Sequence, residues 1–185
     1  MRKIIYTINI SIDGCVDHTS FGPVSPDQEL FDYFTMHMQD VDLDVYGRKM
    51  YELMFPYWSD VAKDQSGTKW ENEFAERLTA IDKVVFSRSL DSVEGNARIV
   101  RTNPVNELLR LKQTPGKNIS VDTVSMFAQI AEAGLIDEYN FVVHPVIVGK
   151  GTRLVEGSLP ERLQLKLVDS IVFKSGAVAL KYLKQ

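Results

Sequence analysis

The sequence has 185 residues with a hydrophobic fraction of 44% and a charged fraction of 25%, a balance that excludes disordered, collagen-like and coiled-coil chains. The 21 basic and 25 acidic residues leave a net charge of −4, which argues against a nucleic-acid-binding protein. The one cysteine, Cys15, cannot form an internal disulfide, and no apolar run is long enough to span a bilayer. We therefore expect a single cytoplasmic domain over residues 1–185, with neither a nucleic-acid nor a membrane partner.

The chain opens with a strand, a long loop and a helix. Apolar residues alternate from Ile4 to Ile12, which predicts a β-strand ending at the Asp13-Gly14 turn. The loop that follows, up to Pro26, is rich in glycine and proline and long enough to act as a lid. A helix is expected to start at residues 25–27, where Ser25 can act as the cap. Its buried stripe would consist of Leu30, Phe31 and Phe34.

Strands and helices then alternate through the middle of the chain. Strands are predicted at residues 41–46, 83–87, 97–100 and 118–121. A brief helix is predicted after Gly47-Arg48, and further helices are predicted over residues 70–81 and from Asn103-Pro104. Another helix is predicted to begin at Val124 and to end at Gly134, with Leu135 in contact with Ile130. The polar stretch 56–67 is expected to be a surface loop.

The chain ends in consecutive strands. These are expected at residues 139–148, with a bulge at Pro145, and at 163–173 and 177–183, joined by a hairpin at Ser175-Gly176. Alternating strands and helices imply parallel crossovers, whereas the final hairpin implies antiparallel strands at the sheet edge. The predicted fold class is therefore α/β, with three layers, a mostly parallel central sheet and antiparallel C-terminal edge strands.

Two turns have the character of anion sites. Gly47-Arg48 follows a strand and opens a helix, whose free backbone N–H groups and dipole favour a phosphate. Ser87-Arg88-Ser89 ends another strand and adds two hydroxyls and a second guanidinium. For either turn alone, the alternative is a glycine turn or a solvated arginine. The three histidines show no metal-ligand spacing, so no metal site is expected, and Cys15 is expected to be a small buried hydrophobe.

Five segments in order resemble the superfamily that holds dihydrofolate reductase and the reductase domain of bifunctional riboflavin biosynthesis enzymes (the RibD C-terminal type). They are residues 11–14 (Ser-Ile-Asp-Gly), 44–52 (Asp-Val-Tyr-Gly-Arg-Lys-Met-Tyr-Glu), 83–90 (Lys-Val-Val-Phe-Ser-Arg-Ser-Leu), 134–138 (Gly-Leu-Ile-Asp-Glu) and 145–151 (Pro-Val-Ile-Val-Gly-Lys-Gly). They span nearly the whole chain, and the similarity is greatest to stand-alone proteins of the riboflavin type. The resemblance implies a dihydrofolate-reductase-like fold, a homodimer formed near the C-terminal strands, and a reductase that uses NADPH.

The resemblance also implies site residues. Gly47, Arg48, Lys49, Ser87 and Arg88 would bind the cofactor phosphates, and Ser11 and Gly14 would border the substrate. Asp122-Thr123 stands where the family has a glycine pair near the phosphates, and Met50 stands where the family has threonine. A carboxylate beside a phosphate repels it, so Asp122 is expected to weaken NADPH binding. A second interpretation makes Asp122 or Thr123 the N-cap of the next helix.

Two carboxyl groups are candidates for the catalytic proton donor. Asp27 stands four residues before Phe31, a spacing similar to that of the dihydrofolate reductases, but it also suits the first turn of a helix. Asp13 is the other candidate, with bracing of its turn as the alternative. The expected substrate is a small heterocycle or a sugar phosphate. A non-catalytic ligand-binding protein with weakened cofactor binding is the alternative function.

Overall fold

Eight strands form one sheet in the order β4-β3-β2-β5-β1-β6-β8-β7. The computed structural model describes residues 1–17, 27–155, 159 and 162–185, so the expected lid and the expected cap Ser25 lie outside the described residues. The strands are β1 (Ile4–Ser11), β2 (Val41–Gly47), β3 (Asp82–Phe86), β4 (Ala97–Val100), β5 (Asn118–Asp122), β6 (Glu138–His144), β7 (Leu165–Val172) and β8 (Val178–Lys184). Neighbours from β4 to β6 run parallel, whereas β6, β8 and β7 pair antiparallel. The predicted α/β class with antiparallel C-terminal edge strands is confirmed.

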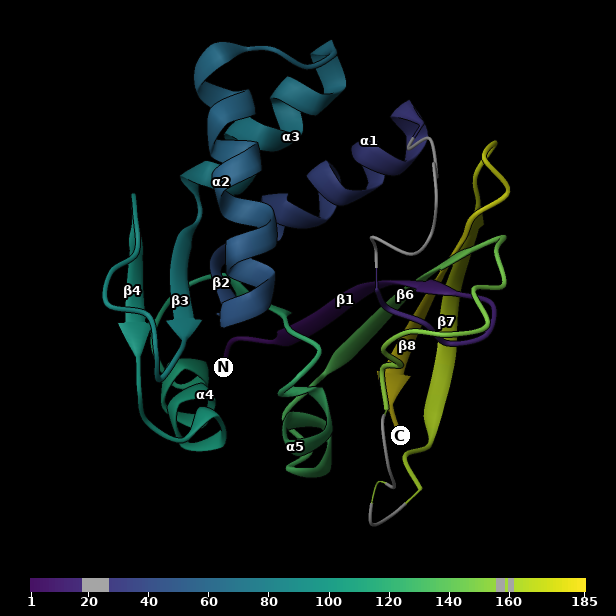
Figure 1. Cartoon of the computed structure of the whole chain (residues 1–185). Coiled ribbons are helices and arrows are strands. Elements are labelled where there is room, and N and C mark those ends of the chain that lie inside the picture. The colour runs from purple at the N-terminus through teal and green to yellow at the C-terminus, as the bar shows by residue number, and fades with distance from the viewer. Residues whose placement is uncertain (18–26, 156–158, 160–161) are drawn as a thin grey trace.

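Helices cover both faces of this sheet (Figure 1). On one face lie α1 (Gln28–His37), the short 3-10 helix η2 (Met38–Asp40), α2 (Arg48–Asp64) and α3 (Lys69–Ala80). On the other lie α4 (Pro104–Lys112) and α5 (Phe127–Glu132). The sheet is thus the middle layer of three, as expected.

The alternation in β1 divides its side chains between the two layers. Ile4, Tyr6 and Ile8 are buried in the main core with residues of α4 and α5. Thr7 and Asn9 face the opposite layer, where they line a cavity. The strand is half apolar because only one of its faces is packed against core side chains.

Helix α2 corrects the expectation of a surface loop over residues 56–67. The helix continues through Pro56 to Asp64 and ends at Gln65, whose φ is 51°. The buried Tyr51, Phe55 and Val61, with the half-buried Trp58, follow one another three or four residues apart on one side of α2, while Pro56 is exposed. The apolar period therefore outweighs the tendency of a proline to end a helix.

The segment around α5 differs from the predicted helix start. The helix begins at Phe127, not at Val124, and its N-cap is Met126, so neither Asp122 nor Thr123 caps it. A turn precedes it, in which the backbone N–H of Met126 donates to the Thr123 hydroxyl at 3.3 Å. The expected ending is confirmed, because the Leu135 N–H donates to the Ile130 carbonyl at 3.2 Å and Gly134 has a φ of 65°.

The C-terminal hairpin is confirmed with small shifts. Phe173 and Ala177 close it by a backbone hydrogen bond of 2.9 Å, and Gly176 has a φ of 84°. The preceding strand β6 ends at His144 and not at residue 148. Pro145 therefore lies past the end of that strand, and the bulge expected there is not needed to accommodate it.

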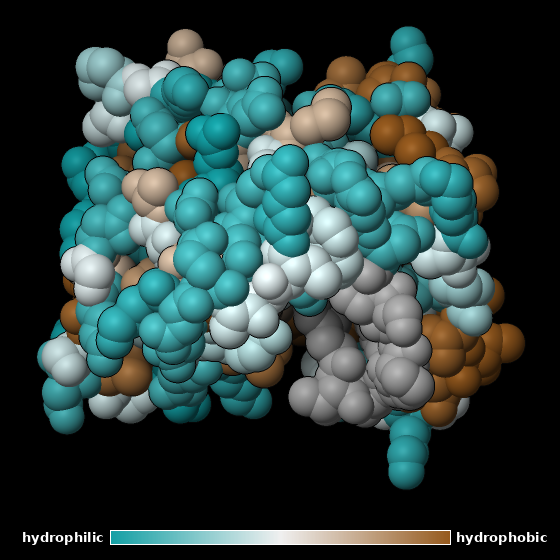
Figure 2. Space-filling model, turned by 90° about the horizontal axis from the view of Figure 1, so that it is seen from above, coloured by the Kyte–Doolittle hydropathy of each residue, from teal (hydrophilic) through white to brown (hydrophobic). Residues whose placement is uncertain are grey.

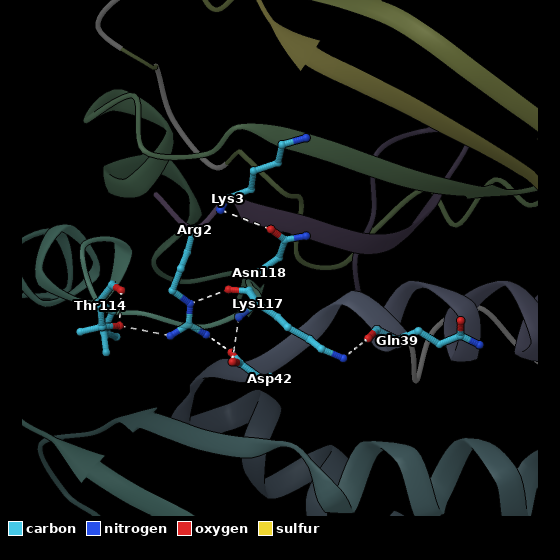
Figure 3. A network of polar contacts seen from close by, with 8 residues as sticks. Arg2, Lys3, Gln39, Asp42, Thr114, Lys117 and Asn118 are labelled. Atoms are coloured by element: carbon cyan, nitrogen blue, oxygen red, sulfur yellow. Dashed lines mark hydrogen bonds and ion pairs between the residues drawn. The ribbon is translucent and has the colours of Figure 1, made fainter.

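A network of polar contacts joins the starting ends of β1, β2 and β5 (Figure 3). The buried guanidinium of Arg2 pairs with Asp42, donates to the Lys117 carbonyl at 2.6 Å and donates to the Thr114 hydroxyl at 3.2 Å. A Cβ on Gly116 would lie 2.6 Å from the Asp42 carboxylate, so this close approach requires glycine. These contacts hold the three central strands together at the end of the sheet where the strands begin.

The surface over the α1–α3 layer is mainly hydrophilic, and hydrophobic residues gather toward the side of the molecule on which β7 lies (Figure 2). On β7 itself the exposed apolar side chains are Leu167, Val168, Ile171 and Val172. Among the described residues, no helix has both the length and the apolar character that a membrane span requires.

Candidate functional site

A cavity of about 340 Å³ lies between the sheet and helices α1, α2 and α3. Its wall is mostly apolar, and an aromatic cluster forms part of it, with ring centroids 5.2 Å apart for Phe31 and Phe74 and 4.8 Å apart for Trp58 and Phe74. The described lining also includes Leu30, Phe34, Met38, Val41, Tyr46, Met50, Met54 and Leu78. We call it the central cavity.

The sheet side of the central cavity carries polar side chains from four strands. They are Thr7 and Asn9 of β1, Asp44 of β2, Ser120 and Asp122 of β5, and His144 of β6. Asp44 pairs in register with Ser120, and Tyr46 with Asp122, so the two carboxyl groups belong to neighbouring strands and are offset by two residues. A largely apolar cavity with a few convergent polar groups is the usual form of a small-molecule site.

Burial changes the acidity of both carboxyl groups. It raises the pKa of Asp122 to about 6, against the lowering effects of the Ser120 hydroxyl and of Lys83. Burial, together with the nearby charge of Asp122, raises the pKa of Asp44 well above its usual value. Burial likewise lowers the pKa of the Lys83 ammonium. Ionisable groups with such shifts in a cavity are typical of functional sites.

A second cavity, which we call the cleft, has a volume of about 450 Å³ and lies at the carboxyl ends of β2 and β5. Its described lining includes Gly47, Lys49, Thr123, Ser125 and Arg153. The central cavity and the cleft adjoin, because Met50 lines both and the consecutive residues Asp122 and Thr123 line one each. Ligands bound in the two would therefore approach each other at the end of β5.

The first predicted anion turn is part of the cleft. Gly47 is the N-cap of the 17-residue helix α2, and no side chain caps that helix. A Cβ on Gly47 would lie 2.7 Å from the Thr123 hydroxyl oxygen, so Thr123 can approach this turn closely only because residue 47 is glycine. The next residue, Arg48, is exposed and pairs with Glu52 at 3.2 Å.

The second predicted anion turn lies beside the first. Gly47 pairs in register with Phe86, so Ser87 follows directly at the same sheet edge. The buried Ser87 hydroxyl accepts from the backbone N–H groups of Ser89 at 3.2 Å and Leu90 at 2.9 Å, while Arg88 is exposed. Ser87 thus shapes the turn that presents Arg88, and neither residue is part of the described cleft lining.

Asp122 and Thr123, expected together beside the phosphates, are separated by the structure. Thr123 lines the cleft, where its hydroxyl lies near Gly47. Asp122 lines the central cavity, on the face of the sheet that α1, α2 and α3 cover, and accepts from the Ser120 hydroxyl at 3.1 Å. The reason is the strand alternation, which turns consecutive side chains to opposite faces. The repulsion expected between Asp122 and a phosphate in the cleft is reduced accordingly.

Asp13 holds the end of β1 to a distant loop. Its carboxylate accepts from the Ser11 hydroxyl at 2.7 Å and from the backbone N–H groups of Val148 at 3.1 Å and Gly149 at 2.8 Å. The Ser11 hydrogen bond, with these two, holds the pKa of Asp13 well below its usual range. Asp13 is therefore ionised at neutral pH and has no proton to donate. The bracing alternative describes its contacts better.

The other residues of this turn are close by. Ser11 is buried and also accepts from the Cys15 N–H at 2.8 Å, and Gly14 has a φ of 84°. Cys15 is 1% exposed, as expected for a small buried hydrophobe. The neighbouring Val16 lines the cleft, so this turn borders the proposed ligand space from one side.

Asp27 is the N-cap of α1, which corrects the expectation that Ser25 is the cap and that Asp27 lies inside the first turn. One carboxylate oxygen accepts from the Leu30 N–H at 2.9 Å, and the other accepts from the Ser175 N–H at 2.9 Å. Asp27 is not among the described residues that line the central cavity. Its contacts therefore position α1 against the C-terminal hairpin, in agreement with the helix-start alternative.

Asp44 was not identified from the sequence as a site residue. The signal was present, because Asp42 and Asp44 interrupt an otherwise apolar strand at two-residue spacing. Only the register of β2 against β5 shows that Asp44 shares a cavity with Asp122. In the described part of the chain, no group of three or more potential ligand residues could hold a metal ion.

Solved structures with the same architecture define the class of the fold. A putative riboflavin biosynthesis protein from Shewanella sp. PV-4 superposes with a TM-score of 0.73 at 19% identity, covering 99% of each chain. Dihydrofolate reductase from Enterococcus faecalis, complexed with NADP(H), superposes with a TM-score of 0.62 at 11% identity, covering 99% of this chain and 96% of the other. The fold is therefore dihydrofolate-reductase-like.

Sequence comparison gives the family. Residues 2–179 match the RibD C-terminal domain, and the chain belongs to that family. The uncharacterized protein YyaP of Bacillus subtilis (strain 168) is 28% identical over 186 residues, covering 98% of this chain and 94% of its own. The predicted resemblance to RibD-type and dihydrofolate-reductase-like proteins is confirmed.

Proposed function

We propose that this protein is an NADPH-dependent reductase that transfers a hydride to a small heterocyclic or sugar-phosphate substrate. The observation that carries the proposal is the junction of two cavities at Met50 and at Asp122-Thr123. A reductase needs such a junction, because the hydride donor and its acceptor must meet with water excluded. Membership of the RibD C-terminal domain family supports the same reaction class.

The residues of the cleft fit a phosphate-bearing cofactor. Gly47 lets the Thr123 hydroxyl lie close to this turn, and the uncapped start of α2 presents N–H groups there. Lys49 and Arg153 add positive charge to the same lining, and Thr123 and Ser125 add hydroxyls. We assign Arg48, Ser87 and Arg88, at the adjoining sheet edge, to the 2′-phosphate. When bound, NADPH would supply the hydride.

In this proposal the substrate occupies the central cavity and Asp122 holds the proton that accompanies the hydride. With a pKa of about 6, its carboxyl group is partly protonated near neutral pH, which suits a proton donor. Ser11, Asp13 and Gly14 keep the turn beside the cleft in place, and Asp27 positions α1. These are positioning roles, in which the side chains hold backbone and do not transfer protons.

Titration with NADPH tests the proposal. We expect the nicotinamide fluorescence to change on binding and NADPH to bind more tightly than NADH. Arg88→Ala should remove most of that preference, because a charge-assisted contact to phosphate contributes roughly 1.5–3 kcal/mol, or about ten- to a hundredfold in affinity. The exposed Arg77, which lies on α3, provides the matched control as Arg77→Ala. Absence of any change at millimolar NADPH would contradict the reductase and leave a non-catalytic ligand-binding protein.

We also propose a homodimer that pairs through the edge strand β7. Its exposed apolar side chains, among them Val172 at 74% exposure, would be covered by a second copy. A sedimentation mass of about 42 kDa, twice the chain mass of 21.0 kDa, is expected, and it should fall to the monomer value on Val172→Asp. A monomer at working concentration would overturn this assembly without affecting the site.

A further inference from the structure

We propose that Tyr6 is a positioning residue for the cleft. Its hydroxyl holds the turn that follows β5, and through that turn it sets how tightly a ligand binds in the cleft. Tyr6 is among the described lining residues of neither the cleft nor the central cavity, so it acts without touching the ligand. The inference rests on the proposed function, because NADPH is the ligand whose binding it explains.

Tyr6 lies in the middle of the sheet and is fully buried. It pairs in register with Val121 of β5 on one side and with Tyr139 of β6 on the other. Its ring contacts Phe127 of α5, with the two ring centroids 4.7 Å apart. Because strand pairing fixes the backbone and close packing fixes the ring, the hydroxyl at the end of the ring has a defined position.

The Tyr6 hydroxyl donates to the main-chain carbonyl of Thr123 at 2.8 Å. Within the described residues no other donor reaches this carbonyl, and Thr123 is 1% exposed. Burial raises the pKa of Tyr6 well above its usual value, so the hydroxyl keeps its proton at neutral pH and remains a donor. A buried carbonyl that loses its donor is costly, so the turn would rearrange without this bond.

The carbonyl held by Tyr6 belongs to a turn that forms one wall of the cleft. Thr123, Val124 and Ser125 all line the cleft. Inside the turn, the Met126 N–H donates to the Thr123 hydroxyl at 3.3 Å and the Phe127 N–H donates to the Val124 carbonyl at 3.2 Å. Both bonds join residues of this segment to one another, whereas the Tyr6 bond ties the segment to the central strand β1.

The opposite wall of the cleft shows why the position of this turn matters. An added Cβ on Gly47 would lie 2.7 Å from the Thr123 hydroxyl oxygen, so the start of α2 and the turn after β5 approach closely. A ligand between them would contact the N–H groups of α2 and the hydroxyls of Thr123 and Ser125 together. Hydrogen bonds weaken steeply when their geometry is lost, so a displaced turn would bind the same ligand less tightly.

Titration with NADPH and NADH tests the proposal in a matched pair of variants. Tyr6→Phe and Tyr139→Phe each remove one buried hydroxyl from neighbouring strands, but the Tyr139 hydroxyl has no hydrogen-bond partner within the described residues. We expect Tyr6→Phe to weaken both cofactors by about fivefold or more, which leaves the preference for NADPH unchanged, and Tyr139→Phe to stay within about twofold of wild type. Equal NADPH affinity of Tyr6→Phe and wild type would overturn the inference.

A restored donor separates positioning from a general loss of packing. The residue 4-aminophenylalanine, incorporated in place of Tyr6, has the same ring and carries an N–H donor where the hydroxyl stood. We expect it to recover NADPH affinity to within about twofold of wild type, because the Thr123 carbonyl again has a donor. An affinity that stays at the level of Tyr6→Phe would contradict the role assigned to the hydrogen bond.

Amide hydrogen exchange in the free protein tests the turn without a cofactor. Tyr6→Phe should speed exchange of the Met126 and Phe127 amides by about tenfold or more beyond any change at Ile119, which pairs with the Lys3 carbonyl at the start of β5. Tyr139→Phe should produce no such difference. Unchanged exchange at the turn in Tyr6→Phe would overturn the inference whether or not NADPH binds, whereas absence of NADPH binding to wild type would contradict the reductase proposal alone.

Discussion

Two aspartates on one strand, two residues apart, have opposite surroundings. Asp42, near the start of β2, pairs with Arg2 and accepts from the Lys117 N–H at 2.8 Å. Asp44, further along β2, is buried and has neither kind of contact within the described residues. Both carboxyl groups come from the same sequence motif, so the difference arises entirely from what the fold places beside them.

The comparison separates a structural end of the sheet from a ligand-binding end. Where β1, β2 and β5 start, charges are paired and a glycine is packed closely, so the strands are held in register. Where β2 and β5 end, carboxyl groups face a cavity and a glycine borders a cleft. Stability is concentrated at one end, and uncompensated polar groups, which cost stability, are retained at the other. We expect substitutions at the two ends to differ in sign.

The largest effect is expected at the structural end. Arg2→Ala should lower the free energy of unfolding by about 3 kcal/mol, because it leaves the Lys117 carbonyl and the Asp42 carboxylate without their shared donor. Urea denaturation measures the change. Arg77→Ala on the exposed face of α3 is the control and should shift stability by less than about 0.5 kcal/mol. A similar effect for both arginines would show that the network carries no special stability.

The next effect is a pH dependence at the ligand-binding end. The folded-state pKa of Asp122, about 6, lies above its unfolded value, so the folded state binds the extra proton. That stabilisation is present below about pH 4 and is lost as the pH rises through 6. Between pH 4 and 7, wild type should therefore lose about 2 kcal/mol more stability than Asp122→Asn does.

Comparison of wild type with Asp122→Asn isolates the titration of the Asp122 carboxyl group from that of other ionisable groups. Asp44 and Lys83 interact with Asp122, as do the buried Tyr6 and Tyr46, while His37 and His144 line the same cavity. Asp13, Glu29 and Glu107, whose pKa values are lowered, change stability in the opposite direction but do so in both proteins. Parallel stability curves would contradict the raised pKa.

A smaller loss is expected from Gly116→Ala at the structural end. Gly116 has a φ of 148°, and an added Cβ would lie 2.6 Å from the Asp42 carboxylate and 3.0 Å from the Arg2 guanidinium carbon. We expect a loss of about 1.5 kcal/mol from backbone strain and displacement of the ion pair. In the Arg2→Ala background the same substitution should cost measurably less, since the pair is already gone. Full additivity in a double-mutant cycle would rule out the coupling.

The smallest effect has the opposite sign. Asp44→Asn replaces a buried carboxyl group that has no hydrogen bond or ion pair within the described residues, and should raise stability at pH 7 by about 1 kcal/mol, whereas Asp42→Asn should lower it. Thermal unfolding of the two variants under identical conditions gives both values. Destabilisation by Asp44→Asn would mean that this carboxyl group, too, belongs to the scaffold.

The sequence predicted the order of elements well because strand alternation and helix ends are local signals. The β1 alternation and the Gly134 ending follow from a few neighbouring residues, and both are confirmed. Helix α2 was underestimated because the polar character of residues 56–67 was given more weight than the apolar period that continues from Tyr51 to Val61. Local rules cannot weigh one against the other without the packing against α3 and the sheet.

The site was harder to predict because it depends on register between distant segments. The resemblance brought Gly47, Lys49 and Thr123 together as expected, and they line one cleft. It did not separate Asp122 from Thr123, which requires knowing where β5 ends and α5 begins. Asp44 depends on three non-local facts, namely the register to Ser120, the register to Lys83 and the cavity left beneath α1–α3.

The most direct test of the two-ended sheet is a carboxyl ¹³C NMR titration of Asp44 and Asp122 in the folded protein. The Asp122 step should occur at an apparent pKa near 6, and the pKa of Asp44 should lie well above the usual value for aspartate, because both carboxyl groups are buried. Two carboxyl groups that both titrate in the usual range of exposed aspartates would contradict the claim that this end of the sheet keeps uncompensated polar groups.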